Sequence, residues 1–197
     1  MLAFALALPA AASLAATLVV FGDSLAAGYG LPREQGWVHL LEQRLRAEHP
    51  DYKVVNASIS GETALGGVNR IGAVLKAHRP AIVILELGAN DGLRGAAPES
   101  IRGSLEAISD ACRRAGARVL LVGIRLPPNY GEAYTEAFQD IYLKVARSRK
   151  LPLVPFLLDG FSDNRTLFQD DGIHPNAVAQ PLMLETVWKE LRPLLKQ

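Results

Sequence analysis

The sequence predicts a three-layer α/β sandwich built around a five-stranded parallel sheet. Three observations support this fold class. Five short apolar runs occur along the chain, helical patterns alternate with them, and one of these runs, residues 81–87, is apolar at nearly every position. Alternating strands and helices are joined by right-handed crossovers, which place helices on both faces of a parallel sheet. A strand that lacks polar alternation suits the buried centre of such a sheet.

The predicted elements follow one another without a linker or an internal repeat. The five strands are expected at residues 17–21, 53–56, 81–87, 117–124 and 153–156. Two helices are indicated by apolar residues at helical spacing, and these residues are Trp37, Leu40, Leu41 and Leu45, then Val68, Ile71, Val74 and Leu75. Three further helices are expected at residues 98–114, 132–149 and 176–195.

Length and charge limit the classes of function. A chain of 197 residues fits one domain, here 17–197, whose core needs no disulfide or structural metal. With 21 basic and 20 acidic residues and no run of Lys and Arg, the sequence excludes a nucleic-acid partner. The single cysteine, Cys112, falls on the apolar face of a predicted helix and is expected to be a buried, inert thiol. No clustered metal ligands are visible, so neither a metal nor a cofactor is expected.

The first sixteen residues are apolar and small, which is typical of a secretory signal peptide. They are too short to span a bilayer comfortably and lack the preceding positive residues, so a start further upstream is expected. The alternative is a hydrophobic N-terminal helix. No cysteine follows the segment, which disfavours a lipid anchor. We therefore expect a periplasmic or secreted monomer without a stable membrane anchor.

Ligands of parallel sheets bind at the carboxyl ends of the strands. In this sequence, each unusual polar or glycine-rich segment follows a strand; these segments are residues 22–25, 58–62, 88–92 and 170–175. The sequence therefore predicts that the four loops meet at one edge of the sheet and form a site there.

Ser24 lies in Gly22-Asp23-Ser24-Leu25, directly after the first predicted strand. A tight turn into a helix N-terminus suits a nucleophile, because backbone N–H groups and the helix dipole face the hydroxyl. The alternative is that Ser24 or Asp23 only caps a helix, which is the commoner role for such residues.

His174 has an aspartate three residues before it, in Asp171-Gly172-Ile173-His174-Pro175. Asp171 can reach the imidazole within one turn and fix its tautomer, as the orienting acid of a catalytic base does. Asp170 is the second choice for that acid. The alternative for His174 is a loop histidine that caps the following helix. The other histidines, His39, His49 and His78, fall in predicted helices or helix ends and are weaker candidates for a base.

A serine hydrolase also needs donors for the oxyanion that forms on the substrate. Gly61, after the second strand, can present a bare backbone N–H, and Asn90, after the third, can present its side-chain amide. The alternatives are a turn glycine with positive φ and a loop cap.

The four blocks that carry Ser24, Gly61, Asn90 and His174 resemble, in order and context, those of the Ser-Gly-Asn-His (SGNH), or GDSL, hydrolases. The resemblance spans residues 17–195 and is closer still to the bacterial periplasmic thioesterase, lysophospholipase and arylesterase branch. It rests on GDSLAAGYGLP, VVNASISGET, ELGANDGLRG, IRLPPNYG and QDDGIHPN. It implies a flavodoxin-like sheet and a serine hydrolase without a cofactor.

By this resemblance, Ser24, Asp171 and His174 form a catalytic triad. The Ser24 N–H, the Gly61 N–H and the Asn90 amide form the oxyanion hole. One departure is visible, because Ala89 stands where the family often has glycine, and it is expected to narrow the space beside Asn90. The serine is not in a Gly-x-Ser-x-Gly motif, so an α/β-hydrolase arrangement does not fit.

The expected substrate is a small acyl ester or thioester, with lysophospholipids and aryl esters included by resemblance. Several residues in or near loops are candidates to line an acyl site, namely Leu93, Pro127, Pro128, Tyr130, Phe138 and Ile173. Two alternatives remain open at this point. One is a carbohydrate deacetylase of the same family, although no Trp cluster offers a sugar platform. The other is a non-catalytic envelope binding protein that keeps the fold.

Overall fold

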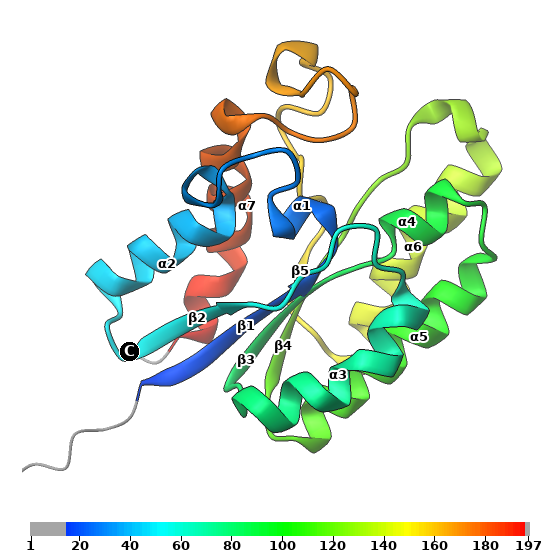
Figure 1. Ribbon diagram of the computed structural model, residues 1–197. Coiled ribbons are helices and arrows are strands. Elements are labelled where there is room, and N and C mark those ends of the chain that lie inside the picture. The colour runs from blue at the N-terminus through cyan, green and yellow to red at the C-terminus, as the bar shows by residue number, and fades with distance from the viewer. Residues whose placement is uncertain (1–14, 196–197) are drawn as a thin grey trace, which may run out of the picture.

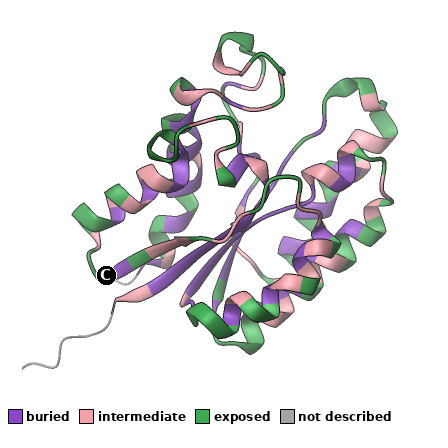
Figure 2. Ribbon diagram, viewed as in Figure 1, coloured by how far each residue is buried: buried purple, intermediate pink, exposed green. Residues whose placement is uncertain are grey.

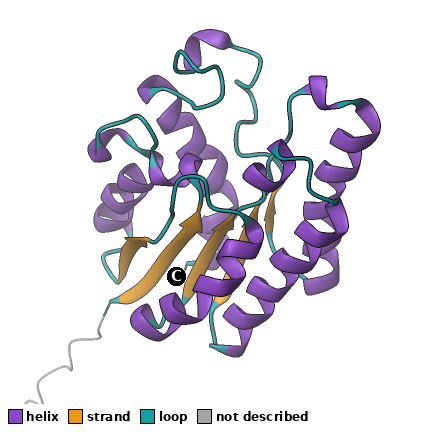
Figure 3. Ribbon diagram, turned by 45° about the vertical axis from the view of Figure 1, so that its right-hand side comes forward, coloured by secondary structure: helices purple, strands orange, loops and turns teal. Residues whose placement is uncertain are grey.

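Five parallel strands form the centre of the molecule, in the order β2-β1-β3-β4-β5. The computed structural model describes residues 15–195. In Figure 3 the arrows of the sheet point the same way, toward loops gathered at one edge. The strands are β1 (Ala16–Gly22), β2 (Tyr52–Asn56), β3 (Ile82–Glu86), β4 (Arg118–Val122) and β5 (Leu153–Val154). The predicted fold class is confirmed.

Helices cover both faces of the sheet, as Figure 1 shows. One face carries α2 (Trp37–Glu48) and α7 (Gln180–Leu191), which contact each other. The other face carries α3 (Ala64–His78), α5 (Pro98–Arg114) and α6 (Glu132–Arg149), with α5 packed between its two neighbours. Two short helices, α1 (Ser24–Ala27) and α4 (Ala89–Leu93), follow β1 and β3 closely, and neither has a range among the predicted elements.

The core lies along the central strands. All five residues of β3 are buried, as expected for a strand covered on both faces, and residues 18–21 of β1 are 0 % exposed. Figure 2 shows this buried sheet between helices whose outer faces are exposed. Cys112, on α5, is also buried, and burial raises the pKa of its thiol to about 12. The prediction that Cys112 is buried is therefore confirmed, and the raised pKa agrees with an inert thiol.

The first four strands differ from their predicted bounds by one or two residues at an end. Proline contributes to two further differences. The last strand ends at Val154 instead of residue 156, because Pro155 has no N–H to donate to the sheet. The predicted helix 176–195 is α7 flanked by two 3₁₀ turns, Ala177–Ala179 and Arg192–Leu194. Pro193 removes a helical N–H in the second of these turns.

The N-terminal segment that the sequence marks as a signal peptide, residues 1–16, lies mostly outside the described residues, which begin at residue 15. Ala16 is already the first residue of β1 and pairs with Tyr52. Within residues 15–195, no helix has the length and apolar character needed to cross a membrane.

Candidate active site

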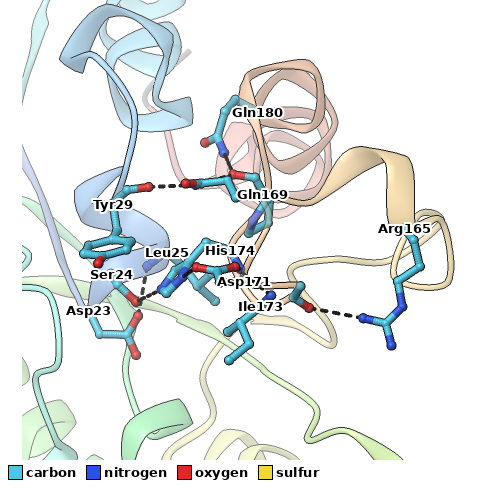
Figure 4. A network of polar contacts seen from close by, with 12 residues as sticks. Asp23, Ser24, Leu25, Tyr29, Arg165, Gln169, Asp171, Ile173, His174 and Gln180 are labelled. Atoms are coloured by element: carbon cyan, nitrogen blue, oxygen red, sulfur yellow. Dashed lines mark hydrogen bonds and ion pairs between the residues drawn. The ribbon is translucent and has the colours of Figure 1, made fainter.

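Ser24 is the first residue of α1, directly past the carboxyl end of β1. Asp23 caps this helix, because its Oδ1 accepts the N–H of Leu25 at 3.0 Å. The capping role considered for the Gly-Asp-Ser-Leu segment therefore belongs to Asp23. Ser24 itself is half-buried, and its hydroxyl is directed to His174 (Figure 4).

The three residues predicted to form a triad lie in one continuous chain of contacts. Ser24 Oγ lies 2.9 Å from His174 Nε2, although 150 residues separate them. His174 Nδ1 lies 2.7 Å from Asp171 Oδ2. A base within hydrogen-bond reach of a hydroxyl, with an acid on its other nitrogen, is the arrangement that activates a serine. Asp170, the alternative acid, is exposed and one residue further from the imidazole.

Asp171 accepts three hydrogen bonds within its own loop. Its Oδ1 accepts the backbone N–H groups of Ile173 and His174, each at 2.9 Å. Slight burial raises the pKa of this carboxyl, but the bonds from His174 and Ile173 outweigh burial and lower the pKa to about 2. Asp171 is therefore ionised at neutral pH and favours a proton on Nδ1 of His174, which leaves Nε2 as an acceptor.

The α1 turn leaves one amide for a ligand. Asp23 N–H donates to Glu86 Oε2 at 3.2 Å, and the N–H of Ala26 also bonds to Glu86. The N–H of Leu25 donates to the side chain of Asp23, and the N–H of Ala27 donates to the backbone carbonyl of Asp23. Among the amides of residues 23–27, only the N–H of Ser24 has no acceptor in the described structure. An amide of this kind, next to the nucleophile, suits an oxyanion.

Gly61 and Asn90 lie on the neighbouring loops. Gly61 has φ of +79°, which favours glycine, and a Cβ placed there would meet no atom within 4 Å. Asn90 lies in α4, and its Nδ2 donates to Asp23 Oδ2 and to the Glu62 carbonyl, both at 3.1 Å. An amide nitrogen carries only two hydrogens, so Asn90 must exchange or share one of these bonds when it donates to an oxyanion.

Two buried carboxyl groups lie beneath the nucleophile. Burial raises the pKa of Asp23 to about 6, although the hydrogen bond from the Leu25 N–H and the charge of His174 both act to lower it. Glu86 is 0 % exposed, and burial raises the pKa of its carboxyl well above the ordinary value, with the charge of Asp23 adding to the effect. Its Oε1 has no partner in the described structure. Burial therefore favours the neutral form of Glu86, whose Oε2 accepts the N–H of Asp23.

The candidate acyl-site residues differ in their surroundings. Ile173 is 50 % exposed and lies beside His174 (Figure 4). Leu93 and Tyr130 contact each other, because the Tyr130 hydroxyl donates to the Leu93 carbonyl at 3.2 Å. The two prolines at residues 127 and 128 are exposed in a loop before α6. Phe138 was wrongly placed near a loop: it lies within α6 at 0 % exposure and belongs to the core.

The hollow beside the nucleophile is small. It has a volume of about 150 Å³ and is lined by Ser24, Leu25, Gly28, Tyr29, His174, Pro175 and Gln180.

Two further arrangements were missed by sequence reasoning. The ring of Tyr29 lies 4.6 Å from the ring of His174, centroid to centroid. Arg70 holds the loop that carries Gly61, because it donates to Glu62 Oε2 and to the Ala57 carbonyl, each at 2.7 Å. A lone acid within an apolar strand would have pointed to Glu86. No sequence pattern predicts the contacts of Tyr29 or Arg70, because they depend on how the loops pack.

A doubly wound sheet with a serine, a histidine and an aspartate in contact at the carboxyl ends of its strands defines an acyl hydrolase of the serine type. The sequence pattern of the GDSL-like lipase/acylhydrolase family matches residues 20–180. The chain belongs to this family, and it is an ester-cleaving enzyme.

Named relatives agree with this assignment. "Esterase TesA" of Pseudomonas aeruginosa is 52 % identical over 181 residues, which cover 92 % of this chain and 90 % of the relative. "Thioesterase 1/protease 1/lysophospholipase L1" of Escherichia coli is 44 % identical over 184 residues. The matched region covers 93 % of this chain and 87 % of the relative. A crystal structure described as TesA superposes with a TM-score of 0.89 at 52 % identity, covering 91 % of this chain and 99 % of that one.

Proposed function

We propose that this enzyme hydrolyses carboxylic esters and thioesters through an acyl intermediate on Ser24. The observation that carries the proposal is the pair of contacts from Asp171 to His174 at 2.7 Å and from His174 to Ser24 at 2.9 Å. A nucleophile, a base and an orienting acid in this sequence of contacts supply what acyl transfer requires.

In the proposed cycle, His174 Nε2 takes the proton of Ser24 Oγ while Oγ bonds to the substrate's carbonyl carbon. The carbonyl oxygen becomes an oxyanion, and its collapse breaks the bond to the alcohol or thiol, which leaves with the proton from His174. Water then repeats both steps on the acyl-enzyme and releases the acid. Asp171 remains ionised throughout and stabilises the imidazolium that forms in each half of the cycle.

Three donors serve the oxyanion in this proposal: the N–H groups of Ser24 and Gly61 and the amide of Asn90. The support for Ser24 is that Glu86 and Asp23 occupy the neighbouring amides of the turn. The support for Gly61 is that its N–H donates to no acceptor among the described hydrogen bonds. For Asn90 it is the position in α4, where the amide donates to the Asp23 carboxyl next to the nucleophile. Each such donor typically contributes about 3–4 kcal/mol to lowering the barrier.

We infer a substrate range of acyl-thioesters, lysophospholipids and aryl or alkyl esters. The named activities of the relatives support it. The acyl chain would extend from Ser24 over apolar residues of the loops, for which Leu93, Pro127, Tyr130 and Ile173 are the candidates. The exposed Ile173 beside His174 and the shallow hollow at Ser24 support a chain held on an open surface.

The test is kcat/KM for p-nitrophenyl esters and acyl-CoAs of two to sixteen carbons, with a lysophospholipid and acetylated sugars included. Each buried methylene is worth about 0.8 kcal/mol, so kcat/KM should rise about threefold or more per carbon and then level off where the apolar surface ends. A maximum at acetate, or faster turnover of sugar acetates than of longer esters, would assign the enzyme to carbohydrate deacetylation instead.

We also infer export to the periplasm or the medium as a monomer, with residues 1–16 as the signal peptide. The apolar, small-residue composition of that segment supports export. N-terminal sequencing of the protein recovered from a bacterial periplasmic fraction tests it. A mature chain that begins near the start of β1 is the expected result, and an uncleaved cytoplasmic chain contradicts the inference.

A further inference from the structure

The carbonyl of Pro175, the residue after His174, receives two side-chain amides. Gln169 Nε2 donates to it at 3.2 Å and Gln180 Nε2 at 3.3 Å. The backbone N–H of Gln169 also donates to the His174 carbonyl at 2.8 Å. The backbone that follows the imidazole is therefore fixed by two glutamines, one from the loop before it and one from the start of α7 (Figure 4).

Both glutamines also reach the part of the chain that carries Ser24. Gln180 Oε1 accepts the backbone N–H of Trp37 at 3.0 Å, and the indole Nε1 of Trp37 donates to the Leu25 carbonyl at 3.0 Å. Leu25 follows the nucleophile directly. Gln169 Nε2 donates to the carbonyl of Tyr29 at 2.8 Å, in the loop after α1. The nucleophile's side and the base's side of the site are thus connected by two separate bridges.

The connection through Gln180 is buried. Gln180 is 2 % exposed and Trp37 is 0 % exposed. Besides Pro175, Gln180 Nε2 has the Asn176 carbonyl within 3.3 Å, so both ends of the amide are hydrogen-bonded. A buried amide must satisfy its polar atoms, and an apolar side chain of similar size would fill the same space without that requirement. Packing alone therefore does not explain a glutamine at this position.

We propose that Gln169 and Gln180 are positioning residues, which set the separation of His174 Nε2 from Ser24 Oγ by bridging the two loops. This inference rests on the proposed function. Neither glutamine contacts the reacting atoms, and each acts through the imidazole. A misplacement of about 1 Å at a reacting group can cost about 10²-fold in rate, so small shifts of the histidine loop are sufficient for a large effect.

The experiment replaces each glutamine by methionine, which is similar in size but cannot form the bridge. We expect Gln180→Met and Gln169→Met each to lower kcat for p-nitrophenyl butyrate about 10- to 100-fold, with KM within about twofold. Gln43→Met is the matched control, because Gln43 is an exposed residue of α2 whose amide contacts only His39 among the described hydrogen bonds. Its kcat should equal that of the wild type.

The same substitutions in a His174→Ala variant separate a positioning role from general destabilisation of the fold. In His174→Ala, the same methionine substitutions should leave the residual hydrolysis unchanged, because the group they position is absent. Near-UV circular dichroism and melting temperature verify the native fold. If Gln180→Met does not fold, Gln169→Met, in a half-buried loop position, decides the question.

Unchanged kcat in the folded methionine variants, or an equal loss in both backgrounds, would overturn the positioning role. Ser24→Ala distinguishes this failure from that of the proposed function. An inactive Ser24→Ala with fully active glutamine variants rejects only the positioning role, whereas an active Ser24→Ala rejects the nucleophile itself.

Discussion

Asp171 holds His174 at two points: its Oδ1 accepts the histidine's backbone N–H at 2.9 Å, and its Oδ2 lies 2.7 Å from the ring Nδ1. One carboxylate thus fixes both the loop and the orientation of the imidazole. Asp171→Asn should therefore lower kcat about 10²- to 10⁴-fold, because the amide disturbs the tautomer of His174. Steady-state kinetics measure this, with Asp170→Asn as the matched control. Greater damage from the Asp170 change would reverse the assignment.

The hydrogen bonds to Asp171 also make the stability of the folded protein depend on pH in the acidic range. The pKa of Asp171 is lowered to about 2 in the folded protein, from an ordinary value of 3.8. Its stabilising contribution is therefore fully present above about pH 4 and is lost as the pH falls toward 2. The melting temperature of the wild type should exceed that of Asp171→Asn by a constant amount above pH 4. The difference should shrink between pH 4 and 2, and a difference that grows in this range would contradict the assignment.

Asn90 is expected to stabilise the transition state more than the bound substrate. Asn90→Ala should lower kcat about 10²- to 10³-fold with little change in KM. Its amide already bonds to Asp23 and to the Glu62 carbonyl, so the fold of the variant needs to be verified by its melting temperature. A variant altered mainly in KM would move Asn90 from the oxyanion hole to substrate binding.

We expect the protein to tolerate replacement of Glu86 by glutamine but not by leucine. Burial favours the neutral form of its carboxyl, and Glu86→Gln keeps an oxygen for the N–H groups of Asp23 and Ala26. We expect activity within about threefold of the wild type for this variant. Glu86→Leu leaves those buried N–H groups without an acceptor and should cost about 1–3 kcal/mol of unfolding free energy. Equal losses in both variants, measured by denaturation and kinetics, would show that Glu86 acts as a charge.

The fold class was predictable because five apolar runs alternate along the chain with five helical segments. The helices at 98–114 and 132–149 match the prediction in both bounds. The short helices α1 and α4 were not predictable in this way, because four or five residues are too few to show a period. Proline accounts for the early end of β5, at Val154 before Pro155.

The site was predictable where its residues carry a local motif. Ser24 follows a strand within Gly-Asp-Ser-Leu, and Asp171 precedes His174 by three residues, so each was found before the structure, and the structure brings all three together. Their catalytic roles remain predictions. Glu86 was missed although a lone acid in an apolar strand is a sequence signal. Gln180 was missed because its partner Trp37 lies 143 residues away, and only the packed fold makes that contact visible.

The central claim is that Ser24 carries the acyl group, and covalent labelling tests it most directly. After reaction with an alkyl fluorophosphonate, mass spectrometry of the digested enzyme should find one adduct, on the peptide that contains Ser24, in proportion to the activity lost. Ser24→Ala should remain unlabelled and fold normally, with kcat lowered about 10⁴-fold or more. An adduct on another residue, or near-normal turnover by Ser24→Ala, would contradict the mechanism.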